Sequence, residues 1–419
     1  MVMPPAFRSR PFTLYWIGHL VSVAGSQMQL WALYWHLRTL SDQPMVISGV
    51  GLVRFLPILL LSLVAGVAAD RFNRRKMAII TQVALGCVAL TLGLSTWRNV
   101  VSLWILFGLV AVQAVAVAFD VPARQALIPS LVPRENLANA YSMNSIASKV
   151  GGILGPAVSG VVIAYLGLQW AYWINAISFL AVIAALIAMG DIPTVIVKRP
   201  FGVKGTFRDI REGIVFIRNS PIIRSVMILD FFGTFFSSAN TLLPFVAMDI
   251  LHVGPIQYGW LSASQSIGTM MMGLYLSQKA KLRHQGMLLS VSVVGFGLAT
   301  LLFGVSTSFW LTMLALILIG AFDGLGSIIR NTVRQLLTPD AMRGRMMSIT
   351  QIFFKGGPQL GEVESGLVAQ VLGVPFAIIS GGVGCVLAAV IVVRKFPQLW
   401  KYSGDEAING EHVAVRPAL

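Results

Sequence analysis

Six charged side chains lie inside stretches of sequence that are otherwise apolar. They are Arg54, Lys149, Asp230, Lys355, Glu362 and Glu364. A charge at the centre of a bilayer costs about 2.5–3.5 kcal/mol on the insertion scale, so each is expected to face a partner or a wet cavity. A carboxylic acid in such a cavity can load and release a proton near neutral pH. We therefore predict that Asp230 or Glu362 couples transport to protons and that Arg54 and Lys149 attract an anionic part of a substrate. Mutual neutralisation of these charges is the alternative.

The elements that must hold these groups are long apolar segments. Of the 419 residues, 56% are hydrophobic and only 11% are charged, and the mean hydropathy is +0.78. So little charge does not cover the surface of soluble domains, which predicts an integral membrane protein. An α-helical span needs about 20 mostly apolar residues. Twelve segments qualify: 12–37, 45–69, 77–96, 101–119, 138–165, 170–189, 222–246, 258–277, 287–305, 309–329, 347–372 and 376–393.

The formal net charge of +15 would suit a nucleic-acid-binding protein, but the positions of the basic residues favour another explanation. With both termini in the cytoplasm, 26 of the 31 Lys and Arg fall in cytoplasmic segments, and only Arg38 and Arg98 lie outside. Basic residues concentrate on the cytoplasmic side of membrane proteins. The asymmetry therefore predicts a multi-pass protein with this orientation in a bacterial-type cytoplasmic (inner) membrane. We therefore expect the protein to lie in a lipid bilayer and to bind no nucleic acid.

An internal repeat relates the two parts of the chain. The triplet Ala-Phe-Asp that ends at Asp120 returns at Asp323, and Gly155 maps onto Gly361 at a shift of 206. Two parallel halves of this kind predict an all-α membrane protein with twelve transmembrane helices in two pseudo-symmetric six-helix halves. The expected divisions are an N-terminal half at 1–189, a cytoplasmic linker at 190–221, a C-terminal half at 222–393 and a cytoplasmic tail at 394–419.

Polar residues spaced three and four apart mark the helix faces that are expected to line a cavity. In the eleventh segment the stripe includes Gln351, Lys355 and Glu362, and similar stripes run through the first, seventh and eighth segments. Together they predict a central hydrated cavity for a small amphiphilic organic substrate. The candidate substrate-binding residues are Trp31, Arg54, Gln113, Lys149, Phe235, Asn240, Gln351 and Lys355. For any single aromatic residue, helix packing or lipid contact is the alternative.

The loop after the second segment reads Gly66-Val-Ala-Ala-Asp70-Arg71-Phe-Asn-Arg74-Arg75. It resembles the G-x-x-x-D-R-x-x-R-R signature of the major facilitator superfamily, with Asn where glycine is usual. The resemblance implies that Gly66, Asp70, Arg71, Arg74 and Arg75 form a conformational latch of the outward-facing state. The corresponding loop of the second half, at 279–284, has no aspartate, so the latch is expected to be asymmetric. The alternative is that these basic residues only hold the loop on the cytoplasmic side, as the positive-inside rule describes.

The fifth segment contains Gly151-Gly-Ile-Leu-Gly155-Pro156-Ala-Val-Ser-Gly160. This is similar to the superfamily's antiporter motif, G-x-x-x-G-P-x-x-G-G, and the resemblance implies efflux; bland helix packing is the alternative. Residues 119–135 are similar to the branch that contains the enterobactin exporter and the macrolide-efflux proteins. Many proton antiporters carry an arginine three residues before a glutamine in the fourth span. This chain has valine three residues before Gln113, so coupling through the usual group is not implied.

The resemblance implies a monomeric secondary active transporter that exports a drug or siderophore-like compound by alternating access, in exchange for protons. The sequence has no HExxH, Walker A, GxSxG or complete GxGxxG motif, so enzyme activity, ATP use, a metal and a cofactor are not expected. Two alternatives remain open. One is an importer or passive facilitator of the same fold, and the other is a non-transporting membrane receptor or scaffold.

Overall fold

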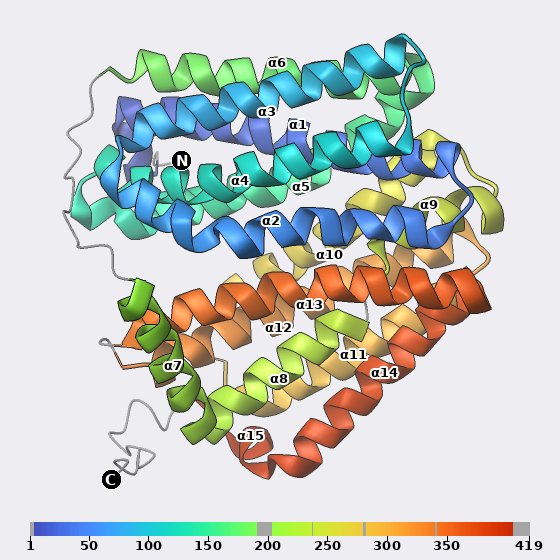
Figure 1. Cartoon of the computed structure of the whole chain (residues 1–419). Coiled ribbons are helices and arrows are strands. Elements are labelled where there is room, and N and C mark those ends of the chain that lie inside the picture. The colour runs from blue at the N-terminus through green and yellow to red at the C-terminus, as the bar shows by residue number, and fades with distance from the viewer. Residues whose placement is uncertain (1–3, 191–202, 237, 280–281, 340–341, 405–419) are drawn as a thin grey trace. The chain divides into compact units, whose positions relative to one another are not determined.

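A computed structural model describes residues 4–190, 203–236, 238–279, 282–339 and 342–404, without the side chains of 62–63, 66–67, 69–71, 203–210, 343–345, 347–349 and 351–355. The described part consists of helices and connecting turns and contains no strand (Figure 1). The first six helices are α1 (Arg10–Leu40), α2 (Pro44–Arg71), α3 (Arg74–Trp97), α4 (Leu103–Leu131), α5 (Leu137–Tyr165) and α6 (Leu168–Ala188). The remaining helices are α7 (Val203–Asn219), α8 (Pro221–Phe236), α9 (Leu243–Phe245), α10 (Pro255–Ser277), α11 (Gln285–Val305), α12 (Phe309–Leu337), α13 (Arg343–Leu372), α14 (Val374–Lys395) and α15 (Pro397–Lys401).

Polar side chains define where several of these helices begin. The Asn73 side chain accepts a hydrogen bond from the Lys76 amide at 3.1 Å, at the start of α3. At the start of α4, the Ser102 hydroxyl accepts one from the Ile105 amide at 3.4 Å. Such caps satisfy backbone N–H groups that have no partner within the helix. Short polar turns therefore separate the long apolar helices.

Nine helical segments in the described part of the chain are long and apolar enough to cross a membrane. They are Pro44–Leu61, Arg74–Trp97, Leu103–Leu131, Arg134–Tyr165, Leu168–Ala188, Pro221–Ile250, Gln285–Val305, Phe309–Leu337 and Val374–Lys395. The long helices α1, α10 and α13 coincide with three further expected segments but are not among the nine. These three helices carry polar stripes, which lower their mean hydropathy.

The chain divides into two compact units. One comprises Met1–Phe201 with Ala247–Ala263, and the other comprises Gly202–Val246 with Ser264–Leu419. In the first unit α1 packs against α5 and α6, and α3 packs against α4 and α6. In the second unit α8 packs against α13 and α14, and α11 packs against α12 and α14. The pairings of helices in the two units therefore correspond in chain order, as the internal repeat leads one to expect.

Glycines that match in the repeat bring backbones together in both units. A Cβ atom added at Gly155 of α5 would lie 2.5 Å from the carbonyl oxygen of Ala24 in α1. At Gly361 of α13, an added Cβ would collide with the carbonyl oxygen of Phe235 in α8. Small residues allow this close approach of transmembrane helices. The repeat thus preserves the tight contact of α5 with α1 and of α13 with α8.

The expected seventh span, 222–246, is interrupted. Helix α8 ends at Phe236, a 3₁₀ turn covers Asn240–Leu242, α9 follows, and a π-helical turn covers Val246–Ile250. Beyond α8, Pro244 has no amide hydrogen to donate, and the Ser238 hydroxyl donates to the Thr234 carbonyl oxygen at 2.6 Å. Polar side chains that bond to nearby backbone compete with the regular helix. A continuous helix over this segment was therefore the wrong expectation.

Replacing Gly155 with alanine should destabilise the protein, because the new methyl group would overlap the backbone of α1. The matched control is Gly108→Ala in α4, where an added Cβ meets no atom within 4 Å. Overpacking of this kind costs about 1–3 kcal/mol. The apparent Tm in detergent is expected to fall for Gly155→Ala and to stay or rise for Gly108→Ala. Equal melting of the two variants would contradict the close contact between α1 and α5.

Candidate functional site

The described part of the expected latch holds neighbouring helices in place. The surroundings of Gly66 and the side chains of Asp70 and Arg71 lie outside the described part, so their latch role stays a prediction. Arg74 donates to the Ala126 carbonyl oxygen of α4 at 2.9 Å. Arg74 thus joins the start of α3 to α4.

Arg75 caps the C-terminal end of α6. Its Nε donates to the Leu186 carbonyl oxygen at 2.6 Å, and its Nη2 donates to that of Ile187 at 3.0 Å. The last carbonyl groups of a helix have no partner within the helix and carry partial negative charge, which favours a cation there. Within the first unit, Arg75 thus joins the start of α3 to the end of α6.

The expected antiporter motif is the packing face of α5. Gly151 lies against Val23 of α1, as Gly155 does against Ala24. At Gly160 an added Cβ would lie 3.0 Å from the Cα of Gly259, and one at Gly259 would lie 2.8 Å from the Pro156 carbonyl oxygen. The motif therefore places backbone against backbone on two sides of α5, a contact that no larger side chain allows.

A buried network of charged and polar groups joins α1, α3 and α4 in the first unit. The Asp120 carboxylate is 1% exposed, pairs with Arg124 at 2.5 Å, and accepts hydrogen bonds from Thr81 at 2.9 Å and Gln82 at 2.7 Å. Arg124 also contacts Nδ1 of His19, 3.2 Å from its Nη1. A buried carboxylate is tolerable when a cation and several donors surround it. Asp120 has such surroundings, with Arg124 one turn farther along the same helix as its cation.

A second polar cluster fixes Gln113 in the first unit. Gln29 of α1 donates to Gln113 of α4 at 3.2 Å, and Asn175 of α6 donates to Gln29 at 2.6 Å. Gln29 is 2% exposed and His19 is 8% exposed. The side-chain amide of Gln29 therefore has partners on two other helices of the unit. That the polar stripe of the first segment lines a hydrated cavity stays a prediction.

The other substrate-binding candidates of the first unit have different surroundings. Trp31 is buried, packs edge-on against Tyr34 at a centroid distance of 5.7 Å, and its carbonyl oxygen accepts a hydrogen bond from Tyr258 at 3.0 Å. Arg54 is half-buried and donates to the Tyr34 hydroxyl at 3.4 Å. Lys149 is exposed. Arg54 and Lys149 therefore keep surface available to a ligand, whereas Trp31 is occupied with packing.

The second unit holds a buried ion cluster in which one arginine contacts two carboxylates. Arg330 of α12 places Nε 2.9 Å from Asp230 of α8, and its Nη2 lies 3.1 Å from Asp323. Arg330 is 4% exposed and Asp230 is 3% exposed, whereas the Asp323 side chain is 43% exposed. Asp323 and Arg330 lie two turns apart on the same helix, α12. Sequence reasoning missed the link from Asp230 to Arg330, since spacing along one chain does not show which helices meet.

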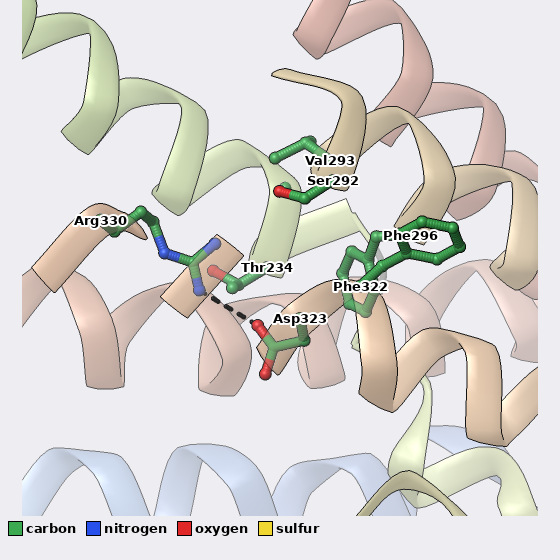
Figure 2. A pocket seen from close by; sticks show the side chains of 8 residues that line it. Thr234, Ser292, Val293, Phe296, Phe322, Asp323 and Arg330 are labelled. Atoms are coloured by element: carbon green, nitrogen blue, oxygen red, sulfur yellow. Dashed lines mark hydrogen bonds and ion pairs between the residues drawn. The ribbon is translucent and has the colours of Figure 1, made fainter. Parts of the chain in front are cut away.

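A small cavity lies beside this cluster. It has a volume of about 10 Å³ and is bordered by Thr234, Ser292, Phe296, Phe322 and Arg330, among others. Figure 2 shows Arg330 pointing toward Asp323, and Thr234 and Ser292 line the same cavity. This volume corresponds to about one water molecule. The cluster therefore combines carboxylates, a cation and space for water, which are the parts that proton exchange requires.

The remaining candidates of the second unit are placed in part. Asn240, in the interrupted segment, accepts a hydrogen bond from Gln265 at 3.0 Å. Phe235 stacks on Phe231 at a centroid distance of 5.9 Å, and Glu362 is 5% exposed. The side chains of Gln351 and Lys355 lie outside the description, so their roles stay predictions.

Changing Asp120 to asparagine should destabilise the first unit, because Arg124 would lose its buried counter-charge. Removing one partner of a buried pair costs about 3–5 kcal/mol. The double variant Asp120→Asn/Arg124→Gln is expected to recover part of that loss in denaturant or thermal unfolding. Arg98→Gln, at an exposed loop arginine, is the control and should melt like the original. Strictly additive effects of the two substitutions would show that the pair is not coupled.

Comparison with known proteins gives matches along most of the chain. The transmembrane secretion effector family, MFS_3, matches residues 3–413. The enterobactin exporter EntS of Citrobacter koseri is 27% identical over 341 residues, which cover 81% of this chain and 80% of that protein. EntS of Escherichia coli O81 is 27% identical over 342 residues, with 80% and 81% coverage.

Solved structures of transporters share the fold. A bacterial homologue of the human lysosomal transporter Spinster, in an inward-facing and occupied conformation, gives a TM-score of 0.68 at 16% identity, covering 95% of this chain and 99% of that one. A POT family transporter in complex with 5-aminolevulinic acid gives 0.73 at 13% identity, with 92% and 96% coverage. With its apolar helices and the family match, the protein is a multi-pass membrane protein. The chain belongs to the transmembrane secretion effector family and is a transporter of the major facilitator type.

Proposed function

We propose that this protein exports an amphiphilic organic compound, of drug or siderophore-like kind, in exchange for protons. The observation that carries the proposal is the buried Asp230–Arg330–Asp323 cluster with its adjacent cavity. Ionisable groups inside the membrane region of a transporter are candidates for proton relays. Similarity to the enterobactin exporters over four-fifths of the chain supports the export direction and the substrate class.

The proposed architecture has twelve spans in two halves, 1–189 and 222–393, with a linker at 190–221 and a tail at 394–419. Both termini lie in the cytoplasm of a bacterial cell, and the transporter acts as a monomer. The distribution of the 31 basic residues supports this orientation. Alternating access moves the halves, and the motif of Gly66, Asp70, Arg71, Arg74 and Arg75 latches one of the end states.

In the proposed coupling step, Asp230 takes up a proton and loses its charge. Arg330 then retains Asp323 as its charged partner, because both carboxylates contact the same guanidinium group. Arg334 lies one turn farther along α12 and donates to the Arg330 carbonyl oxygen at 3.2 Å, which keeps a second cation nearby. Protonation of Asp230 thus changes the attraction between α8 and α12. Glu362 of α13 is the second candidate proton carrier.

Everted membrane vesicles test export and coupling together. Candidate amphiphiles should accumulate in vesicles that contain the protein when the vesicle interior is more acidic than the medium. Collapse of this proton gradient should abolish accumulation. Asp230→Asn is expected to remove the dependence on the gradient, since an amide does not exchange a proton. Glu362→Gln should do so if Glu362 also carries protons, and Glu364→Gln is the matched control. Fully gradient-driven accumulation in both Asp230→Asn and Glu362→Gln would exclude the proposed carriers.

The two basic side chains Arg54 and Lys149 should favour the binding of anionic substrates. Arg54→Gln or Lys149→Gln is expected to raise the KM for an anionic amphiphile about tenfold, the size of one lost charge-assisted contact. The KM for a neutral amphiphile should change little. Arg98→Gln removes an exposed arginine outside the proposed cavity and serves as the control. An unchanged KM in both variants would remove Arg54 and Lys149 from the binding site.

A further inference from the structure

An apolar groove lies between α8 and α14 of the second unit. It has a volume of about 550 Å³, and its walls include Ile228, Phe232 and Phe236 from α8 and Leu387, Ile391 and Lys395 from α14. These two helices lie side by side, with α15 next to them (Figure 1). No part of the transport proposal uses this groove.

The groove is open to the surroundings of the unit. Phe232 is 40% exposed, Leu387 is 54% exposed and Ile391 is 60% exposed. Helix α14 is among the most apolar of the helices that are long enough to cross a membrane. Exposed apolar side chains on such a helix contact lipid chains rather than water. The groove is therefore a hollow in a lipid-facing surface.

Positive charge gathers at the end of the groove. Lys395 lines it, and the Arg224 guanidinium lies 4.9 Å from the ring centre of Phe396, which also lines it. Arg394 and Lys401 flank this end, and residues 374–404 include no Asp or Glu. Clusters of basic residues where a membrane helix ends attract anionic lipid headgroups.

Helix α15 packs the chain that follows α14 against the rest of the second unit. Leu399 is fully buried and Tyr402 is 2% exposed, and the Tyr402 carbonyl oxygen accepts a hydrogen bond from the Gly286 amide of α11 at 3.0 Å. Trp400 remains 43% exposed beside them. Tryptophan is common at the boundary between headgroups and acyl chains. The basic end of the groove thus lies where a headgroup would be expected.

We propose that the groove between α8 and α14 is a binding site for an anionic glycerophospholipid. One acyl chain lies along the apolar wall, and the phosphate pairs with Lys395 and with Arg224. The proposal depends on the protein's position in a membrane but not on the direction of transport or its coupling. Its failure would therefore leave the export proposal intact, and the reverse also holds.

Native mass spectrometry of the full-length protein in mild detergent tests this site. Phosphatidylglycerol and zwitterionic phosphatidylcholine with identical chains are the probes. The original protein is expected to retain phosphatidylglycerol preferentially, and Lys395→Gln should weaken that retention about fivefold. Lys279→Gln removes an exposed lysine outside the groove and should have little effect.

Filling the groove supplies an independent test. Ala388→Phe and Leu387→Trp add bulk to the groove and should lower retention of both lipids, whereas Val383→Phe adds bulk at an exposed position of α14 outside it. Melting temperatures identify any variant that fails to fold, and Leu387 is exposed enough to tolerate a larger side chain. Equal retention of the two lipids by the original protein would overturn the proposal. Unchanged retention in Lys395→Gln, or in both groove-filling variants, would also overturn it.

Discussion

The low dielectric of an apolar helix bundle is the constraint on which the rest of this structure depends. Removing a charge from water is expensive, so a buried charge persists only when opposite charge and hydrogen-bond donors surround it. Asp120 meets this condition through Arg124, Thr81 and Gln82. Asp230 meets it through Arg330. In each unit the buried carboxylate links neighbouring helices, α3 with α4 in the first unit and α8 with α12 in the second.

The two charge clusters occupy related places in the repeat but differ in character. Asp120 is almost fully enclosed, and its contacts come from two helices that pack tightly against one another. Such an arrangement favours a structural role for this carboxylate, because a cation and two donors already occupy its oxygens. In the second unit Arg330 contacts both Asp230 and the partly exposed Asp323, and a cavity of water size adjoins them. A guanidinium group that contacts two carboxylates has two alternative partners, which suits a change of protonation better than a saturated site does.

Sequence patterns predicted the helices where the structure depends on residues that are neighbours along the chain. Apolar length identified the nine described segments that can cross a membrane, and glycine spacing identified the packing face of α5. Both signals depend on residues close together along the chain. The break after α8 was not predicted, since its serines and Pro244 lie within a strongly apolar segment. The contact of Asp230 with Arg330 joins residues 100 positions apart and depends on how α8 and α12 pack. The burial of Gln29 was missed for the same reason, because its partners Gln113 and Asn175 lie on other helices.

The glycine contacts between α5 and α1 and between α13 and α8 have a consequence for electrical insulation. A membrane protein must not let ions or protons leak across the bilayer through its own helix contacts. Backbones in direct contact, as at Gly155 and Gly361, leave no volume in which a file of water molecules could form. At these two contacts the helices therefore leave no room for a water-filled path along their interface. Glycine, which has no side chain, is thus the residue that keeps water out of these helix interfaces.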